Sequence, residues 1–180
     1  MRQASGSLRV DGDIMKHYIS ALVENKAGVL TRISGLFARR NFNINSLAVG
    51  ETDDPEISRV TIVVEGNDNV AGQVTKQLSK LIDVLKVKNL DQAFMTQREL
   101  ILIKVRISSE QRSEIYDLAK IMGCEIVDIS HTTLMIEFDD RTPKIDLLVE
   151  LLAEYEIIEL VRTGAIALQK GENTIHDDDE

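Results

Sequence analysis

The stretch from Glu24 to Ser46 holds the residues whose types and spacing could do chemistry, and that chemistry is the binding of a small anion. Apolar residues before Glu24 form a run of strand length, and those from Val29 to Phe37 recur at helical spacing. A helix that begins just after Gly28 points its free N–H groups and its positive dipole end back at the loop, which suits a carboxylate. Asn25 and Gly28 would also shape a tight strand-to-helix turn, and the loop taken alone favours that plainer role.

A free amino acid would match this loop at both of its charged groups. The N–H groups from Gly28 to Leu30 would hold the carboxylate, while a side-chain amide carbonyl and nearby backbone carbonyls accept from the ammonium. Gly28 has no side chain, so a ligand can approach the backbone closely. If two such sheets join side by side, Asn43 of one subunit would close the pocket over the loop of the other. An apolar ligand side chain would then contact Val29, Leu30 and Ile44.

No other group of residues in the sequence favours catalysis or metal binding. Asp53 and Asp54 precede Pro55 at the tip of an expected hairpin, where a turn role explains them. The single cysteine, Cys124, excludes an intramolecular disulfide and a multi-cysteine metal site, and we expect it to be a small buried hydrophobe. There is no phosphate-cradling loop and no nucleophile elbow. The three histidines lie far apart in the sequence, without partners at ligand spacing: His17, His131 and His176.

The composition limits the partners and the compartment. A formal net charge of −9 and a pI near 4.9 argue against a nucleic-acid partner. No apolar run approaches membrane-spanning length, and residues 1–14 lack the apolar core of a signal peptide, so we expect a soluble cytoplasmic protein with no membrane partner. We interpret residues 1–14 as a disordered extension or an expression remnant.

Hydrophobic periodicity predicts the order strand, helix, strand, strand, helix, strand twice along the chain. In the first half, helices are expected from Val29 to Arg40 and from Val70 to Leu81, the second with Asp68 as its N-cap. In the second half, Ser108 and Gln111 have the spacing of a capping box, Gly123 suits a helix C-terminus, and Thr142-Pro143 resembles an N-cap followed by proline. The last strand is expected from Tyr155 towards Ala167.

This doubled order is the ferredoxin-like arrangement, so we predict an α+β fold of two βαββαβ domains in tandem. The domains are expected at residues 15–91 and 98–170, with a polar linker at residues 92–97 between them. Residues 171–180 are expected to be a disordered acidic tail. Each domain is small for a single core, which makes additional burial by dimerisation plausible.

The order of motifs resembles one known family. Glu24-Asn25-x-x-Gly28-x-Leu30-x-Arg32, then Leu36-Phe37-x-x-Arg40 and Asn43-Ile44-x-Ser46-Leu47, resembles the ACT domain of the acetolactate (acetohydroxyacid) synthase small subunit. Thr52-Asp53-Asp54 and Ser58-Arg59-x-Thr61 extend the resemblance, while Arg98-Glu99-Leu100, Ile103-Lys104-Val105 and Arg162-Thr163-Gly164 are similar to the family's C-terminal domain. The resemblance covers nearly all of Met15 to Lys170. Where the family usually has glycine after the first helix this chain has Asn41, which also tolerates the left-handed conformation.

The resemblance implies a regulatory subunit with no catalytic activity or cofactor of its own. Such subunits bind the catalytic (large) subunit, which carries thiamine diphosphate, FAD and magnesium, and raise its activity. They also make that enzyme of branched-chain amino-acid biosynthesis sensitive to feedback inhibition, commonly by valine. The implied effector site lies between two ACT domains of a homodimer. Its residues are Asn25, Lys26, Ala27, Gly28, Val29 and Leu30 of one protomer, with Asn43 and Ile44 of the other.

Three other functions compete with this one. A stand-alone tandem amino-acid sensor acting through another protein partner would use the same loop, and only saturable activation of acetolactate synthase separates the two. An RNA-recognition module shares the element order but requires aromatic residues and a basic sheet, whereas this chain is 4% aromatic and acidic. A small enzyme of ferredoxin-like fold lacks any candidate catalytic residues.

Overall fold

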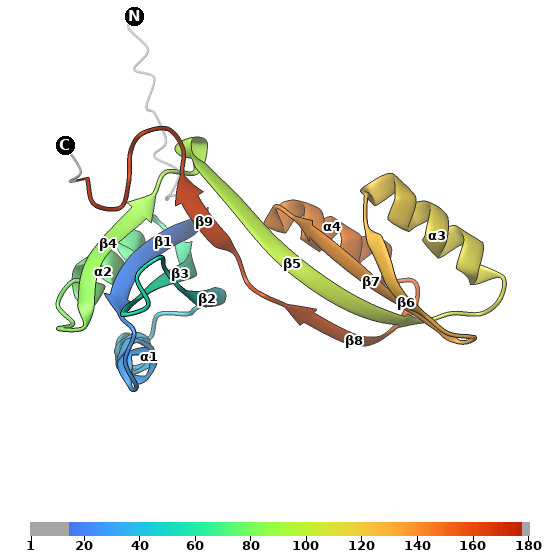
Figure 1. Ribbon diagram of the computed structural model, residues 1–180, viewed down its shortest axis with the longest axis horizontal. Coiled ribbons are helices and arrows are strands. Elements are labelled where there is room, and N and C mark those ends of the chain that lie inside the picture. The colour runs from blue at the N-terminus through green and yellow to red at the C-terminus, as the bar shows by residue number, and fades with distance from the viewer. Residues whose placement is uncertain (1–14, 178–180) are drawn as a thin grey trace, which may run out of the picture.

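One long strand, β5 (Met95–Arg106), runs through both halves of the molecule (Figure 1). The computed structural model describes residues 15–177. The elements of the first unit, in chain order, are β1 (Met15–Glu24), α1 (Val29–Arg40), β2 (Ser46–Glu51), β3 (Ile57–Gly66), α2 (Asp68–Leu78) and β4 (Val84–Leu90). Their strands form an antiparallel sheet in the order β2-β3-β1-β4, so β2 and β4 are its edges.

The second unit repeats this arrangement around the distal part of β5. Its other elements are α3 (Gln111–Met122), β6 (Glu125–Ile129), β7 (Thr133–Asp140), α4 (Thr142–Leu151) and β8 (Glu156–Arg162). The strand order is β6-β7-β5-β8, again antiparallel. The prediction of two tandem ferredoxin-like units is confirmed. No helix within residues 15–177 is long and apolar enough to cross a membrane.

Alternation along the strands determines which face of each sheet is buried against helices. In β1, the alternate residues Ile19, Ala21 and Val23 are buried beneath α1 and α2 in one core cluster. In β5, the alternate residues Ile101, Ile103 and Val105 are likewise buried beneath α3 and α4, in a second core cluster. Each unit therefore has its own apolar core, as a two-domain chain requires.

The helix ends follow some of the predicted caps and depart from others. Ser108 and Gln111 form the predicted capping box, each backbone N–H donating to the other's side chain at 3.0 and 3.3 Å. Asn41 (φ 56°) and Gly123 (φ 79°) end α1 and α3 in the left-handed conformation, as predicted. The prediction for α2 is wrong by one residue, because the Asn67 side chain, and not Asp68, accepts from the Val70 N–H.

Thr142 is also not the N-cap of α4. It is the first residue of the helix, and its hydroxyl donates to the carboxylate of Glu99 at 2.9 Å. Glu99 is only 5% exposed, so its carboxylate requires hydrogen-bond donors from the protein, and the Thr142 hydroxyl is one of them.

The polar connection expected at residues 92–97 is shorter in the structure. A 3₁₀ turn, η1 (Gln92–Phe94), is followed directly by β5. The first four residues of β5, Met95–Arg98, pair with β9 (Ile166–Gln169), so they belong to a ladder and not to a linker. The predicted last strand is accordingly two strands, β8 and β9, separated by residues 163–165.

The β5–β9 ribbon covers the face of the first sheet that the helices leave open (Figure 1). A buried apolar cluster forms there between the sheet and the ribbon, made by Tyr18, Val63, Leu90, Met95, Ala165 and Ala167. Desolvation in this seam raises the pKa of Tyr18, an effect that hydrogen bonding to Thr142 and Gln97 only partly offsets. The two units are therefore joined by a packed seam as well as by the chain.

The prediction of a disordered tail at residues 171–180 is wrong for the part that the structure describes. The chain from Gly171 to Asp177 returns to the first sheet, where Ile175 is buried. The Lys88 ammonium donates to the carbonyls of Thr174 (3.4 Å) and Asp177 (3.3 Å). The burial of Ile175 and the bonds from Lys88 thus hold residues 171–177 against the first sheet. The predictions for residues 1–14 and 178–180 lie outside the described residues.

Cys124, which the sequence predicts to be buried, is partly buried and packs against the core of the second unit, and we expect its thiol to be unreactive in the folded chain. Burial raises the pKa of Cys124 to about 11. At pH 8 we expect iodoacetamide to alkylate it about 100-fold more slowly than in the urea-unfolded chain, because the thiolate is the nucleophile. Mass spectrometry of timed, quenched samples measures both rates. Equal rates in the folded and unfolded chain would contradict the prediction.

Candidate functional site

The helix α1 begins without a cap of its own. Gly28, the residue at its N-cap, has φ 89°, makes no side-chain bond and is followed by a first turn without acidic residues. The first helical bond runs from the Arg32 N–H to the Gly28 carbonyl at 3.0 Å, and the Val29 N–H reaches the Lys26 carbonyl only at 3.4 Å. Within residues 15–177 the amides of Leu30 and Thr31 have no hydrogen-bond partner. The turn therefore presents free donors at the positive end of the helix.

A buried carboxylate fixes the direction in which these donors point. Asp83 is 7% exposed and receives two bonds from the Arg32 guanidinium, of which that from Nη2 measures 2.7 Å. The Asp83 carbonyl accepts the Glu24 N–H at 2.9 Å. Asp83 thus connects the end of β1 to the first turn of α1, and the loop between them is held at both ends.

The Asn25 side chain is oriented by the hairpin between β2 and β3. Its amide nitrogen donates to Glu51 Oε1 at 3.1 Å and to the Pro55 carbonyl at 2.8 Å, and its backbone N–H donates to the Glu56 carbonyl at 2.7 Å. Both side-chain partners are acceptors, so the NH₂ group must face them. No described residue donates to the Asn25 carbonyl oxygen, so it is left as an acceptor in the loop that leads to the free amides of α1. A carboxylate and an ammonium on neighbouring atoms require this combination of donors and an acceptor.

The remaining predicted residues of the loop divide by burial. Leu30 is 45% exposed and can contact a ligand, whereas Val29 is 3% exposed and packs in the core. Helical spacing turns the Val29 side chain inward with Ile33, so its contact with an apolar ligand stays a prediction. Ala27 is exposed, and Lys26 pairs with Glu24 at 3.1 Å on the surface.

Asn43 and Ile44 lie at the other end of α1. The helix is 12 residues long, so its ends are about 18 Å apart, and no single small ligand touches both Asn25 and Asn43 of one protomer. Asn43 is exposed, while Ile44 packs partly against the core. Both precede β2, an edge strand whose last residue, Glu51, contacts Asn25. In an antiparallel pairing of two β2 edges, the start of one strand would lie opposite the end of the other.

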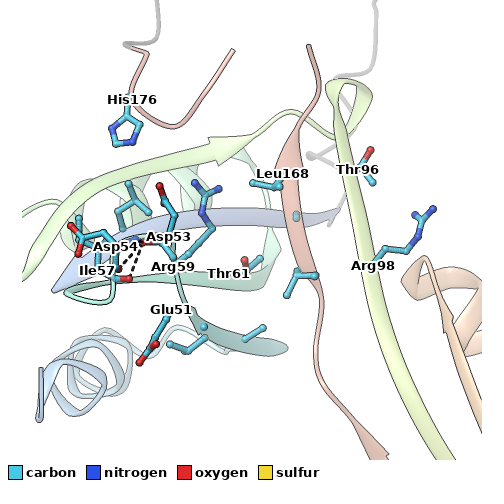
Figure 2. A pocket seen from close by; sticks show the side chains of 17 residues that line it. Glu51, Asp53, Asp54, Ile57, Arg59, Thr61, Thr96, Arg98, Leu168 and His176 are labelled. Atoms are coloured by element: carbon cyan, nitrogen blue, oxygen red, sulfur yellow. Dashed lines mark hydrogen bonds between the residues drawn. The ribbon is translucent and has the colours of Figure 1, made fainter. Parts of the chain in front are cut away.

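A cavity of about 620 Å³ is lined by residues outside this loop, although one of them, Glu51, accepts the bond from Asn25 (Figure 2). The β2–β3 hairpin forms one wall and β9 with the start of β5 forms another; Arg59, Arg98 and His176 are among the lining residues. Burial lowers the pKa of Arg59. None of the eight predicted site residues lines the cavity. Sequence reasoning missed it because its walls come from the β2–β3 hairpin, the start of β5 and β9, segments far apart in the sequence that become neighbours only through the β5–β9 ribbon.

Asp54 at the hairpin tip and the buried His17 make structural hydrogen bonds. Asp54 accepts the Glu56 N–H at 2.9 Å, and its own N–H donates to the Thr52 hydroxyl at 3.2 Å, so the predicted turn role is confirmed. His17 is buried and bonded to the Gly66 carbonyl at 3.1 Å. Within residues 15–177 no group of three or more His, Cys, Asp or Glu side chains could hold a metal ion.

Comparisons with known proteins agree with both halves of the chain. A family model described as an AHAS small subunit-like ACT domain matches residues 19–86, and one described as the small subunit of acetolactate synthase matches residues 98–171. The probable acetolactate synthase small subunit of Methanothermobacter thermautotrophicus is 49% identical over 160 residues, which cover 88% of this chain and 95% of that protein.

Two further relatives, one of them with a solved structure, extend the agreement. The Haemophilus influenzae acetolactate synthase small subunit is 41% identical over 162 residues, 89% of this chain and 99% of that protein. The crystal structure of the small subunit from Thermotoga maritima superposes with a TM-score of 0.82 at 38% identity, covering 89% of this chain and all of that one.

Proposed function

This chain belongs to the family of acetolactate synthase small subunits, and from that premise we propose that it is the regulatory subunit of that enzyme. It binds the catalytic large subunit and raises its activity, in the cytoplasm, as part of branched-chain amino-acid biosynthesis. The reaction and its cofactors, thiamine diphosphate, FAD and magnesium, belong to the catalytic subunit.

We further propose that the chain senses a branched-chain amino acid, with valine as the first candidate, and confers feedback inhibition. The observation that carries this proposal is that one loop leads from Asn25, whose carbonyl oxygen accepts no bond from the described residues, to the uncapped start of α1. The amides of Leu30 and Thr31 bind the carboxylate, and Asn25 accepts from the ammonium. The exposed Leu30 side chain contacts the ligand's branched chain.

The site is completed by a second copy of the chain. Asn43 of one protomer reaches the loop of the other when two first units pair through their β2 edges. Support comes from the position of β2 at the edge of the sheet and from Leu47 and Val49, which are 37% and 43% exposed there. A paired edge would also cover backbone groups that otherwise invite uncontrolled association.

Calorimetric titration of the purified chain with valine tests the effector site, with leucine, isoleucine and serine as comparisons. Saturable valine binding is expected, and Asn25→Ala should weaken it about tenfold or more, because a hydrogen bond to a charged group is lost. Asn69→Ala, a change of the same chemistry at an exposed position of α2, is the control and should bind as the wild type does.

A parallel titration of the catalytic subunit with this chain tests the regulatory role. We expect saturable activation, followed by inhibition when valine is added. Absence of activation would contradict the regulatory role and favour the stand-alone amino-acid sensor. Activation that persists at saturating concentrations of valine, leucine and isoleucine would contradict the feedback role alone.

A further inference from the structure

The strand that follows β8 is interrupted at a buried point between the two units. Thr163 still pairs with β5, its N–H donating to the Leu100 carbonyl at 3.0 Å, and Ile166 pairs with Arg98 at the start of β9. Gly164 and Ala165 lie between these pairs and leave the ladder. Gly164 adopts φ 76°, a conformation that favours glycine, so the chain changes direction here.

Ser46, the first residue of β2, fills this interruption. Ser46 Oγ accepts a hydrogen bond from the Ala165 N–H at 3.1 Å. Ala165 lies where the pairing with β5 is interrupted, so its N–H donates to this side chain and not to a strand. A Cβ atom on Gly164 would lie 3.0 Å from Ser46 Oγ and 3.3 Å from Ser46 Cβ. The start of β2 therefore packs closely against the connection to β8, and the Ser46 hydroxyl makes the hydrogen bond across this contact.

On the β8 side of the interruption, Arg162 ties the chain to the second unit. Arg162 donates two bonds to the buried Glu99, at 2.7 and 2.9 Å, and a third to Asp146 on α4 at 2.8 Å. A shift of Gly164 and Ala165 would therefore move β8 and α4 together. A cavity of about 340 Å³, lined by Asn45 and Ser46 on one side and Asp146 and Arg162 on the other, leaves room for such a shift.

We propose that Ser46 is a positioning residue that couples occupancy of the effector pocket to the placement of the second unit. The inference rests on the proposed function, since Asn43 and Ile44 of that pocket precede Ser46 by three and two residues. A ligand that draws this segment toward the neighbouring protomer moves Ser46, and with it the Ala165 backbone. An effector changes activity only by favouring one arrangement of the molecule over another. In this proposal the two arrangements differ in whether the Ala165 N–H donates to the Ser46 hydroxyl.

Ser46→Ala in the complex with the catalytic subunit tests the coupling. Valine affinity, measured by calorimetry, is expected to stay within about threefold of wild type, whereas maximal inhibition at saturating valine is expected to fall by about half or more. Ser20→Ala is the matched control, because Ser20 is fully buried in the same sheet and its hydroxyl has no hydrogen-bond partner among the described residues. Its inhibition should equal that of the wild type. Inhibition of Ser46→Ala as complete as in the wild type would overturn the proposal.

A distance measurement separates coupling from a simple loss of structure. Spin labels at Lys76 on α2 and Asp117 on α3, both exposed, report the separation of the units after Cys124→Ser removes the native thiol. Saturating valine is expected to shift the mean distance in the wild type and to leave it unchanged in Ser46→Ala. If Ser46→Ala fails to fold, Gly164→Ala perturbs the same contact from the other side and should show the same uncoupling.

The failure of this coupling is distinguishable from failure of the effector site itself. A wild-type complex that valine inhibits without any change in the distance between the units overturns the coupling and leaves the effector site intact. A wild-type complex that no branched-chain amino acid binds or inhibits overturns both.

Discussion

Replacing Arg162 with methionine is expected to lower the free energy of unfolding by about 3 kcal/mol, because it leaves a buried carboxylate without its cation. The guanidinium makes two bonds to Glu99, which is 5% exposed, and one to Asp146. These hydrogen bonds to Glu99 raise the pKa of Arg162, so it stays charged despite partial burial. Methionine keeps much of the apolar stem but, among the described residues, leaves the buried Glu99 carboxylate with only the Thr142 hydroxyl as a donor.

The matched control is Arg106→Met, on the same strand as Glu99. Arg106 pairs with Glu156 at 2.9 Å, but both side chains are more than half exposed. An exposed pair of this kind contributes about 0.5 kcal/mol, because water screens it and its side chains lose rotamer freedom. The free energy of unfolding is therefore expected to fall about six times as much for Arg162→Met as for Arg106→Met. Both variants lose one positive charge, so this difference reports the effect of burying the pair.

Urea unfolding followed by far-ultraviolet circular dichroism measures both variants. The midpoint should fall clearly for Arg162→Met and barely for Arg106→Met, with the slope of the transition unchanged. The double variant Glu99→Leu with Arg162→Met should recover part of the loss, since no buried charge is then left without its partner. Equal midpoints for the two single variants would show that the Glu99–Arg162 pair does not stabilise the fold.

The sequence predicts well those features that depend on near neighbours. The helical and alternating periods of the two halves, the Ser108–Gln111 capping box and the left-handed Asn41 are all local, and the structure confirms them. The predictions from local sequence are wrong where a side chain bonds to a residue far away in the sequence. Thr142 has the chemistry of an N-cap, but its hydroxyl bonds instead to Glu99, 43 residues earlier in the chain.

The same distinction explains the tail and the candidate site. Composition alone predicts that residues 171–177 are solvated, yet Ile175 is buried against the first sheet. No local sequence pattern predicts this contact. The effector loop is predictable as a loop, because Gly28 and the start of α1 are local features. The role of Glu51 and Pro55 in orienting Asn25 is not, since those contacts span 26 and 30 residues.

The position of Asn43 leads to a prediction that only a site shared between protomers can satisfy. Asn25→Ala and Asn43→Ala should each abolish valine inhibition in the homodimer while activation persists. Losing one hydrogen bond to a charged ligand group weakens binding about 10- to 100-fold. In a mixed dimer of the two variants, one of the two symmetric sites carries both changes and the other carries none.

Mixed dimers should therefore regain about half of the valine sites, at wild-type affinity, because a twofold axis makes two equivalent pockets. Co-expression of the two variants with different affinity tags, and purification through both, isolates the mixed species for calorimetry. A mixed dimer of Asn25→Ala with wild type is the control: it should also show one site, whichever protomer supplies Asn43. If the dimer of Asn25→Ala with Asn43→Ala binds no valine, each pocket lies within one protomer. Since the ends of α1 are about 18 Å apart, Asn43 would then act on the pocket of its own protomer only indirectly, without touching the effector.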